Sequence, residues 1–194
     1  MGGASLYLAL SGAFSRDVFA AYPPLLHAMF AATAGWSLWD MGVMMGCGEK
    51  PSMWVHHAIT FTGTTLMQLY RVAAFFPALT LLTELTVLPA NVHWYMGVLR
   101  LKERHPRLYH ANLVARAAFH LLFRLCTCPG TVAWAIRVHG LAGFVRRWRA
   151  LPLVVSGAST FNLLFLSYMN AVWTRGTFRA LARWRKAQRA AKAK

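Results

Sequence analysis

The chain has 194 residues, of which 57% are hydrophobic and only 13% are charged. Soluble domains are typically about half apolar and about a quarter charged, so this composition excludes an ordinary soluble protein and indicates an integral membrane protein. The net charge is +16, from 21 Lys and Arg against 5 Asp and Glu. Because the basic residues gather between apolar runs and near the C-terminus, we expect them to meet anionic lipid headgroups or acidic partners, and not nucleic acid.

The N-terminal segment, residues 1–24, has an apolar run too short to cross a bilayer, and we expect a short amphipathic helix at the membrane interface. Residues 25–173 then contain apolar runs close to the ~20 residues that a helical span requires. These runs cover about Leu25–Met45, Ser52–Tyr70, Ala73–Val98, Tyr109–Pro129 and Leu151–Trp173. The sequence therefore predicts an all-α fold, a polytopic transmembrane helix bundle of about five spans.

Two features interrupt this pattern in the second half of the chain. Pro129, followed by Gly130, is expected to kink or end the fourth span, because proline removes a helical hydrogen bond. The apolar run after it contains Arg137 and His139. We interpret that run as a helix continuation or an interfacial segment.

Residues 174–194 form a basic tail. With five crossings, this tail, the loop RLKERHPR and the turn at Glu49-Lys50 share one side of the membrane, and their positive charge places that side in the cytoplasm or an organelle matrix. Phe178, Leu181 and Trp184 alternate with basic residues near helical spacing. This pattern predicts a basic helix that lies on the membrane surface or docks on a protein partner.

Polar residues recur on one face of several predicted spans, because steps of about four residues align along a helix. The second span contributes His56, Thr60, Thr64 and Gln68; the third Thr80, Glu84, Asn91 and Tyr95; the fourth Asn112, Arg116, His120, Arg124 and Cys128; the first adds Asp40. Polar groups at membrane depth usually face the bundle interior. Two interpretations remain open: these groups satisfy one another and clamp the helices, with Asp40 and Glu84 pairing the arginines, or they border a cavity that contacts a lipid.

The histidine pair limits the possible chemistry. Neighbouring residues on a helix point about 100° apart, so His56 and His57 are poorly placed to chelate one metal ion, and the other histidines are scattered. We therefore expect no metal site. A histidine beside a carboxylate can still act as a general base.

The motifs GWSLWDMG, HHAIT, TELTVLPANVHWY and AAFHLLFRL, then CPG, and finally SYMNAVW before a basic tail, occur in an order that resembles the TLC family of polytopic membrane proteins. That family includes ceramide synthases and non-enzymatic lipid-handling proteins. The resemblance covers about Gly35–Arg175. It implies a helical bundle around a lipid-accessible cavity, with family-type polar positions at Asp40, His56, His57, Glu84, Asn91 and Arg124.

The resemblance also departs from the enzymes of the family. In ceramide synthases the histidine pair and two downstream aspartates are the proposed catalytic set. Glu84 falls at the first aspartate position, but Val87 falls at the second, and an aliphatic side chain can neither carry a proton nor orient a base. The part before the Pro23-Pro24 break also looks shorter than the family's leading span. Both departures favour a non-synthase member.

We therefore expect a non-catalytic TLC-like integral membrane protein that binds lipid or serves as an accessory structural subunit of a larger membrane protein complex. The expected lipid-contacting or cavity-lining residues are Asp40, His56, His57, Thr60, Glu84, Asn91, Arg116, His120 and Arg124. The alternative is an acyl-transfer enzyme resembling ceramide synthases, with catalytic residues His56, His57, Glu84 and Asp40.

The expected partners are anionic membrane lipids and other membrane protein subunits. No cofactor is expected beyond a bound phospholipid or acyl lipid. The endoplasmic reticulum and the mitochondrial inner membrane both fit the composition, with the tail on the cytoplasmic or matrix side.

Overall fold

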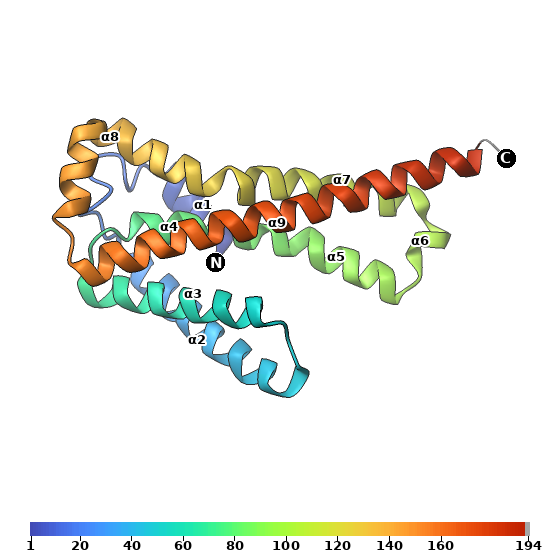
Figure 1. Ribbon diagram of the computed structural model, residues 1–194, viewed down its shortest axis with the longest axis horizontal. Coiled ribbons are helices and arrows are strands. Elements are labelled where there is room, and N and C mark those ends of the chain that lie inside the picture. Colours follow the sequence, from blue (N-terminus) through green and yellow to red (C-terminus); the bar gives the residue numbers. More distant parts are fainter. Residues whose placement is uncertain (193–194) are drawn as a thin grey trace. The chain divides into compact units, whose positions relative to one another are not determined.

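A computed structural model describes residues 1–192, and within that range the chain is helical without strands (Figure 1). The backbone divides into two compact units. The first contains residues 1–82 and 128–166, and the second contains residues 83–127 and the chain from Ser167 onward. The expectation of an all-α fold is confirmed. The last two residues of the predicted basic tail, 193–194, lie outside the described residues.

In the first unit, α2 (Pro24–Cys47) and α3 (Pro51–Tyr70) lie side by side as a helical hairpin (Figure 1). Each begins with proline in its first turn, where a missing N–H leaves no intrahelical hydrogen bond unmade. Gly48 ends α2 in the left-handed conformation, at φ 64°, which glycine adopts without a steric penalty. The Gly48–Lys50 turn then reverses the chain. The bounds agree closely with the first two predicted spans.

The core of the first unit is rich in aromatic side chains. α1 (Gly2–Leu10) packs on α4 (Phe75–Thr80), and every residue of α4 is buried. Phe14 meets Phe75 edge to face, with ring centroids 5.1 Å apart, and Phe19 meets Phe76 at 5.6 Å. Burying each such ring contributes about 1.5–3 kcal/mol. The N-terminal segment therefore supplies part of a hydrophobic core.

The third predicted span is helical from Phe75 to Val98, but it changes geometry along its length. Between α4 and α5 (Val87–Val98) lies the tighter 3₁₀ segment η1 (Leu81–Thr86). Pro89 lacks an N–H and its ring crowds the carbonyl four residues earlier, which explains why the regular α-helical pattern is interrupted just before it.

The fourth predicted span breaks at a different residue from the one expected. α7 (Pro106–Phe119) follows the short α6 (Leu101–Arg104) and continues into η2 (His120–Leu125), a wider π-helical segment. The chain then bends by 41° before α8 (Thr127–Arg149) begins. The bend precedes Pro129, which lies in the first turn of α8, where proline is tolerated. Gly140, at φ 68°, breaks α8 itself.

The fifth predicted span and the basic tail form one helix, α9 (Leu153–Lys192). By length and composition alone, one helical run within residues 1–192, Phe75–Val98, is apolar enough to cross a membrane, or two if the bent pair Pro106–Leu125 and Thr127–Arg149 counts as one span. The number of crossings, five, stays a prediction.

Candidate functional site

The predicted site residues fall into two groups. Asp40, His56, His57 and Thr60 lie on the α2–α3 hairpin of the first unit, whereas the second unit holds Glu84, Asn91, Arg116, His120 and Arg124. Each group is described by itself.

In the hairpin, the carboxylate of Asp40 meets the imidazole of His57. The Asp40 Oδ2 atom lies 3.4 Å from His57 Nε2, and the two side chains are 29% and 12% exposed. The hairpin turn causes this meeting, because residues at similar distances before and after a reversal lie opposite each other. A carboxylate on Nε2 orients the ring and leaves Nδ1 able to accept a proton, which is the arrangement of a general base. The ring of His56 lies 5.2 Å from that of His57, edge to face.

The polar side chains of Thr60, Thr64 and Gln68, which form a stripe along α3, make their hydrogen bonds within that helix. The hydroxyl of Thr60 donates to the carbonyl of His56 at 2.9 Å, and that of Thr64 donates to the carbonyl of Thr60 at 2.8 Å. The amide of Gln68 reaches the carbonyl of Thr64 at 3.4 Å. Such bonds to the preceding turn are the usual way in which a helix carries hydroxyls in apolar surroundings. This part of the stripe therefore requires neither a ligand nor a neighbouring helix.

Arg124, in the second unit, is held by three side chains. Its Nε donates to the hydroxyl of Thr86 at 2.8 Å, one Nη donates to Oδ1 of Asn170 at 3.2 Å, and its guanidinium carbon lies 4.4 Å from the ring centroid of Trp173. The Thr86 hydroxyl in turn donates to the carbonyl of Thr83. Both hydrogen-bond acceptors of Arg124 are neutral.

Arg116 and His120 lie on α7 and η2 close enough to Arg124 to interact with it electrostatically, and so does Glu84 of η1. His120 is buried and Glu84 is half-buried. Arg116 at the end of α7 and His120 and Arg124 in η2 follow one another at steps of four residues, which places them on a similar face of the continuous helical run. The expected pairing of Glu84 with the arginines thus takes the form of an electrostatic interaction with Arg124.

Several buried polar atoms on the helices that carry Arg124 and Asn170 lack a hydrogen-bond partner within the described residues. They are Arg116 Nε, His120 Nδ1, Asn170 Nδ2 and Thr174 Oγ1. Arg116 Nε and Asn170 Nδ2 can only donate. We call Arg116, His120, Arg124, Asn170 and Thr174 the Arg124 cluster. It has more donors than acceptors, a chemistry that suits an acceptor-rich group such as a carboxylate or phosphate.

Asn91 has an exposed side chain on α5. The asparagine that this region buries is Asn112 of α7, whose amide donates to the carbonyl of Pro89 at 3.2 Å and joins α7 to α5.

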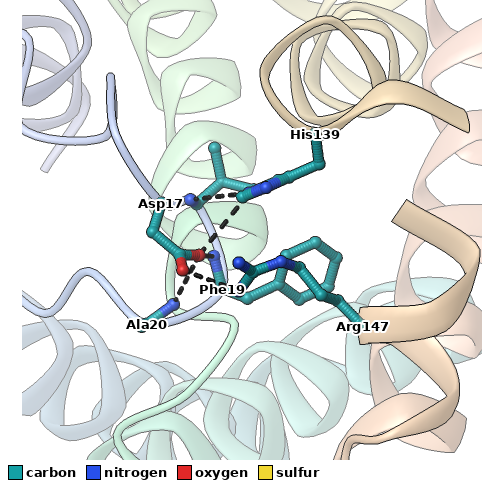
Figure 2. Close-up of polar contacts among 6 residues, drawn as sticks. Asp17, Phe19, Ala20, His139 and Arg147 are labelled. Carbon is teal, nitrogen blue, oxygen red and sulfur yellow. Dashed lines mark hydrogen bonds and ion pairs between the residues drawn. The ribbon is translucent and has the colours of Figure 1, made fainter. Parts of the chain in front are cut away.

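A second polar cluster, absent from the predicted site residues, surrounds Asp17 in the first unit. Figure 2 shows Asp17 facing His139 and Arg147, which both come from α8. One carboxylate oxygen lies 2.6 Å from an Nη of Arg147, and the other accepts the backbone N–H groups of Phe19 and Ala20. His139 Nε2 lies 3.5 Å from Asp17 and also accepts the Val18 N–H at 3.3 Å. These contacts tie the segment after α1 to α8.

The pKa of the Asp17 carboxyl reflects this setting. Burial by itself raises the pKa, but the Phe19 and Ala20 N–H groups, the Arg147 guanidinium and the nearby His139 ring outweigh it and hold the pKa below its ordinary value. The composition offers one clue to this cluster. With only 5 Asp and Glu against 21 Lys and Arg, each acidic side chain has many possible basic partners.

Two pockets lie among other residues. One is a groove of about 710 Å³ between α7 and α9 in the second unit. The other, between α3, α4 and α9 in the first unit, has a volume of about 10 Å³, room for about one water molecule. Neither pocket is lined by the predicted site residues. That those residues border one shared cavity stays a prediction.

No group of three or more His, Cys, Asp or Glu side chains placed to hold a metal ion occurs among residues 1–192. No curated protein and no solved structure matches the chain. A sequence model of the TLC domain matches residues 3–178. The match therefore also includes most of the N-terminal segment, which lies before the motif GWSLWDMG. This match spans most of the chain, and the protein therefore belongs to the TLC domain family of membrane-associated, lipid-related proteins.

Proposed function

We propose that the protein is a non-catalytic membrane protein that binds a lipid through the Arg124 cluster. The observation that carries this proposal is the excess of buried donors: Arg116 Nε and Asn170 Nδ2 have no acceptor, and both acceptors of Arg124 are neutral. Each unpartnered buried polar group costs about 1–3 kcal/mol. A lipid phosphate or carboxylate would supply several acceptors and negative charge together.

The competing interpretation of the cluster is a clamp between helices without a ligand. It accounts well for Thr86, Asn170 and Trp173, which hold Arg124 from η1 and α9. It does not account for Arg116, a half-buried cation whose Nε has no partner. A purely structural clamp leaves this buried Nε without an acceptor, whereas a headgroup site supplies one.

Arg116 therefore provides the decisive variant. The test is native mass spectrometry of the full-length protein, extracted gently from its own membrane, with bound lipids identified. We expect Arg116→Gln to bind one anionic lipid fewer per chain than the unmodified protein while it stays folded, because no hydrogen bond within the protein is removed at Nε. Arg175→Gln, an exposed change on α9, is the matched control and should keep the lipid. An unchanged number of bound anionic lipids per chain in Arg116→Gln would contradict the proposal.

We also propose that five helical segments cross the membrane and that the basic end of α9 lies on the side of the RLKERHPR loop. The length of α3, 20 residues, corresponds to about 30 Å and matches the hydrocarbon thickness of a bilayer. Cysteine labelling tests this topology: single cysteines at Glu49, Glu103 and Arg189 should react with an impermeant reagent from the same side. Labelling of any of them from the opposite side would contradict it.

The protein is further proposed to act as an accessory subunit of a membrane protein complex in an organelle, the endoplasmic reticulum or the mitochondrial inner membrane. The support is the long basic helix α9, which carries exposed Arg179 and Arg183 for contact with acidic surfaces. Fractionation followed by mild-detergent purification tests it. A monodisperse monomer with no co-purifying membrane protein would contradict the assembly role.

The pair of His57 and Asp40 favours one second candidate, an acyl-transfer enzyme. His57 Nδ1 would take a proton from the amine or hydroxyl group of the acceptor substrate. The nitrogen or oxygen atom of that group would then attack the carbonyl carbon of an acyl-coenzyme A. The thioester bond breaks, and the proton passes to the leaving thiolate. Turnover by the purified protein that is lost in both His57→Ala and Asp40→Ala would support this candidate. No turnover across a panel of acceptors would leave the non-catalytic proposal standing.

A further inference from the structure

One groove of the second unit is lined by residues outside the Arg124 cluster. The groove runs between α7 and α9, which are antiparallel: Tyr109 packs on Trp184 with ring centroids 4.8 Å apart, and Leu113 and Ala117 pack with Leu181. Figure 1 shows α7 and the second half of α9 running in opposite directions. These contacts fix the two walls of the groove.

The groove is apolar along most of its length and basic at one end. Its lining comprises Val114, Ala117, Ala118, Leu121, Phe178, Leu181, Ala182, Arg185, Lys186 and Arg189. Ala117 and Leu181 are buried and form the floor, while Phe178, Val114 and Leu121 are each about 40% exposed and form the walls. The basic side chains follow the apolar ones along α9, over about 16 Å from Phe178 to Arg189.

The face of α7 that lines the groove differs from the face that holds Arg116 and His120. With a step of about 100° per residue, Val114 and Ala118 lie about 160° around the helix from Arg116, and Ala117 in the floor lies about 100° from it. The groove is therefore independent of the headgroup site proposed above, and a ligand in one site need not occupy the other.

We propose that this groove binds one acyl chain of an anionic phospholipid, with the phosphate against Arg185, Lys186 and Arg189. Charge complementarity sets the headgroup, because all three charged residues in the lining are cations. The apolar floor and walls suit a hydrocarbon chain. The protein belongs to a membrane-associated family, and its α9 helix is basic toward the C-terminal end. An anionic lipid therefore suits both the apolar and the basic part of the groove.

Volume favours a lipid chain over an acidic helix from a partner protein. About 710 Å³ lies within the ~300–1,000 Å³ typical of small-molecule sites. An α-helix of three turns, about 11 Å wide and 16 Å long, occupies roughly 1,500 Å³, so the groove would hold only part of it.

The test is native mass spectrometry of the full-length protein in detergent, titrated with phosphatidylglycerol or with phosphatidylcholine of the same acyl composition. We expect the groove to bind one phosphatidylglycerol per chain, in addition to any lipid held by the Arg124 cluster, and to bind it at least ~10-fold more tightly than phosphatidylcholine, as basic side chains near an anionic surface predict. The variant Arg185→Gln/Lys186→Gln/Arg189→Gln should weaken phosphatidylglycerol binding by roughly 10- to 100-fold.

A matched variant controls for net charge. Arg175→Gln/Arg179→Gln/Arg183→Gln removes the same number of charges from exposed positions of the same helix outside the groove, and it should leave the preference for phosphatidylglycerol within about 3-fold of the unmodified protein. An equal loss in both triple variants would show unspecific attraction and overturn the proposal. Equal affinity of the unmodified protein for the two lipids would also overturn it.

A steric variant tests the chain-binding part. Ala118→Trp fills the groove from an exposed position of α7 and should abolish binding of both lipids at this site, whereas Ala187→Trp, exposed on α9 outside the lining, should not. An unchanged number of bound phosphatidylglycerol molecules per chain in a folded Ala118→Trp protein would overturn the proposal. If Ala118→Trp does not fold, the triple variants, which change only exposed side chains, decide alone.

Two further arms separate the remaining possibilities. An acidic amphipathic peptide that binds more tightly than phosphatidylglycerol and is blocked by Ala118→Trp would overturn the lipid assignment in favour of a protein partner. Arg116→Gln should leave the groove lipid in place. Failure of the groove proposal and failure of the Arg124-cluster proposal are therefore distinguishable.

Discussion

Arg147 lies on α8 with one Nη 2.6 Å from Asp17 Oδ2, and this ion pair joins positions 130 residues apart in the sequence. The carboxylate also accepts the N–H groups of Phe19 and Ala20, so it shapes the turn after α1 at the same time (Figure 2). The adjacent Phe19 ring then packs on Phe76 and Trp148. A single acid thus positions an aromatic residue in the core of the first unit.

Replacing this acid is therefore expected to destabilise the first unit. Asp17→Ala should lower the free energy of unfolding by about 1–2 kcal/mol, mostly through the lost backbone acceptor, because the partner Arg147 is 42% exposed and its ion pair is screened by solvent. In a chain of this size, such a loss lowers Tm by about 2–8 °C. The measurement is thermal unfolding in detergent, with Glu103→Ala, an exposed change on α6, as control. Equal Tm values for the two variants would contradict the role of Asp17.

The low pKa of Asp17 predicts a dependence of stability on pH. Since the pKa is lower in the folded state, the carboxylate contributes stability above the unfolded-state pKa, near 3.8, and this contribution disappears as pH falls through the folded-state value. The Tm difference between the unmodified protein and Asp17→Asn should be constant from pH 7 to about 5 and shrink below about pH 4. A difference that grows on acidification would contradict the sign of the shift.

The sequence predicted helices well and side-chain partners poorly. Prolines at the start of α2 and α3 and Gly48 at the hairpin turn are local signals, and the predicted spans there agree with the structure. The bend before α8 was misplaced at Pro129, because proline in a first turn is tolerated and the actual break follows a π-helical segment that no residue pattern announces.

The neighbours of Arg124 required tertiary information. Helical spacing placed Arg116, His120 and Arg124 on one face, but nothing in the spacing identified Thr86, Asn170 and Trp173 as the partners of Arg124. The same limit applied to Asp40, whose contact with His57 depends on the register of the α2–α3 hairpin. Periodicity fixes the face of a helix, whereas the packing of the helices fixes which faces meet.

The aromatic core predicts that replacing Phe75 lowers the free energy of unfolding much more than replacing Phe161. Phe75 is 1% exposed between Phe14 and Phe76, and Phe75→Ala should cost about 3–5 kcal/mol through lost burial and an unfilled cavity. Phe161, on α9 of the first unit, is 57% exposed, and Phe161→Ala should cost less than about 1 kcal/mol. The comparison is made by thermal unfolding of both variants in the same detergent. Similar losses in the two variants would contradict the difference in burial between Phe75 and Phe161.

The three-sided contact of Arg124 predicts that lysine cannot replace it. Lysine keeps the charge, but its single ammonium group lacks the planar fork that reaches Thr86 and Asn170 in different directions while its face lies over Trp173. We expect Arg124→Lys to lower the free energy of unfolding by about 1–3 kcal/mol and to expose Trp173 to a soluble fluorescence quencher. Arg179→Lys, exposed on α9, should change neither reading. A fully stable Arg124→Lys variant would show that charge alone holds this position, and the hydrogen bonds to Thr86 and Asn170 would then have no part in joining η1 and η2 to α9.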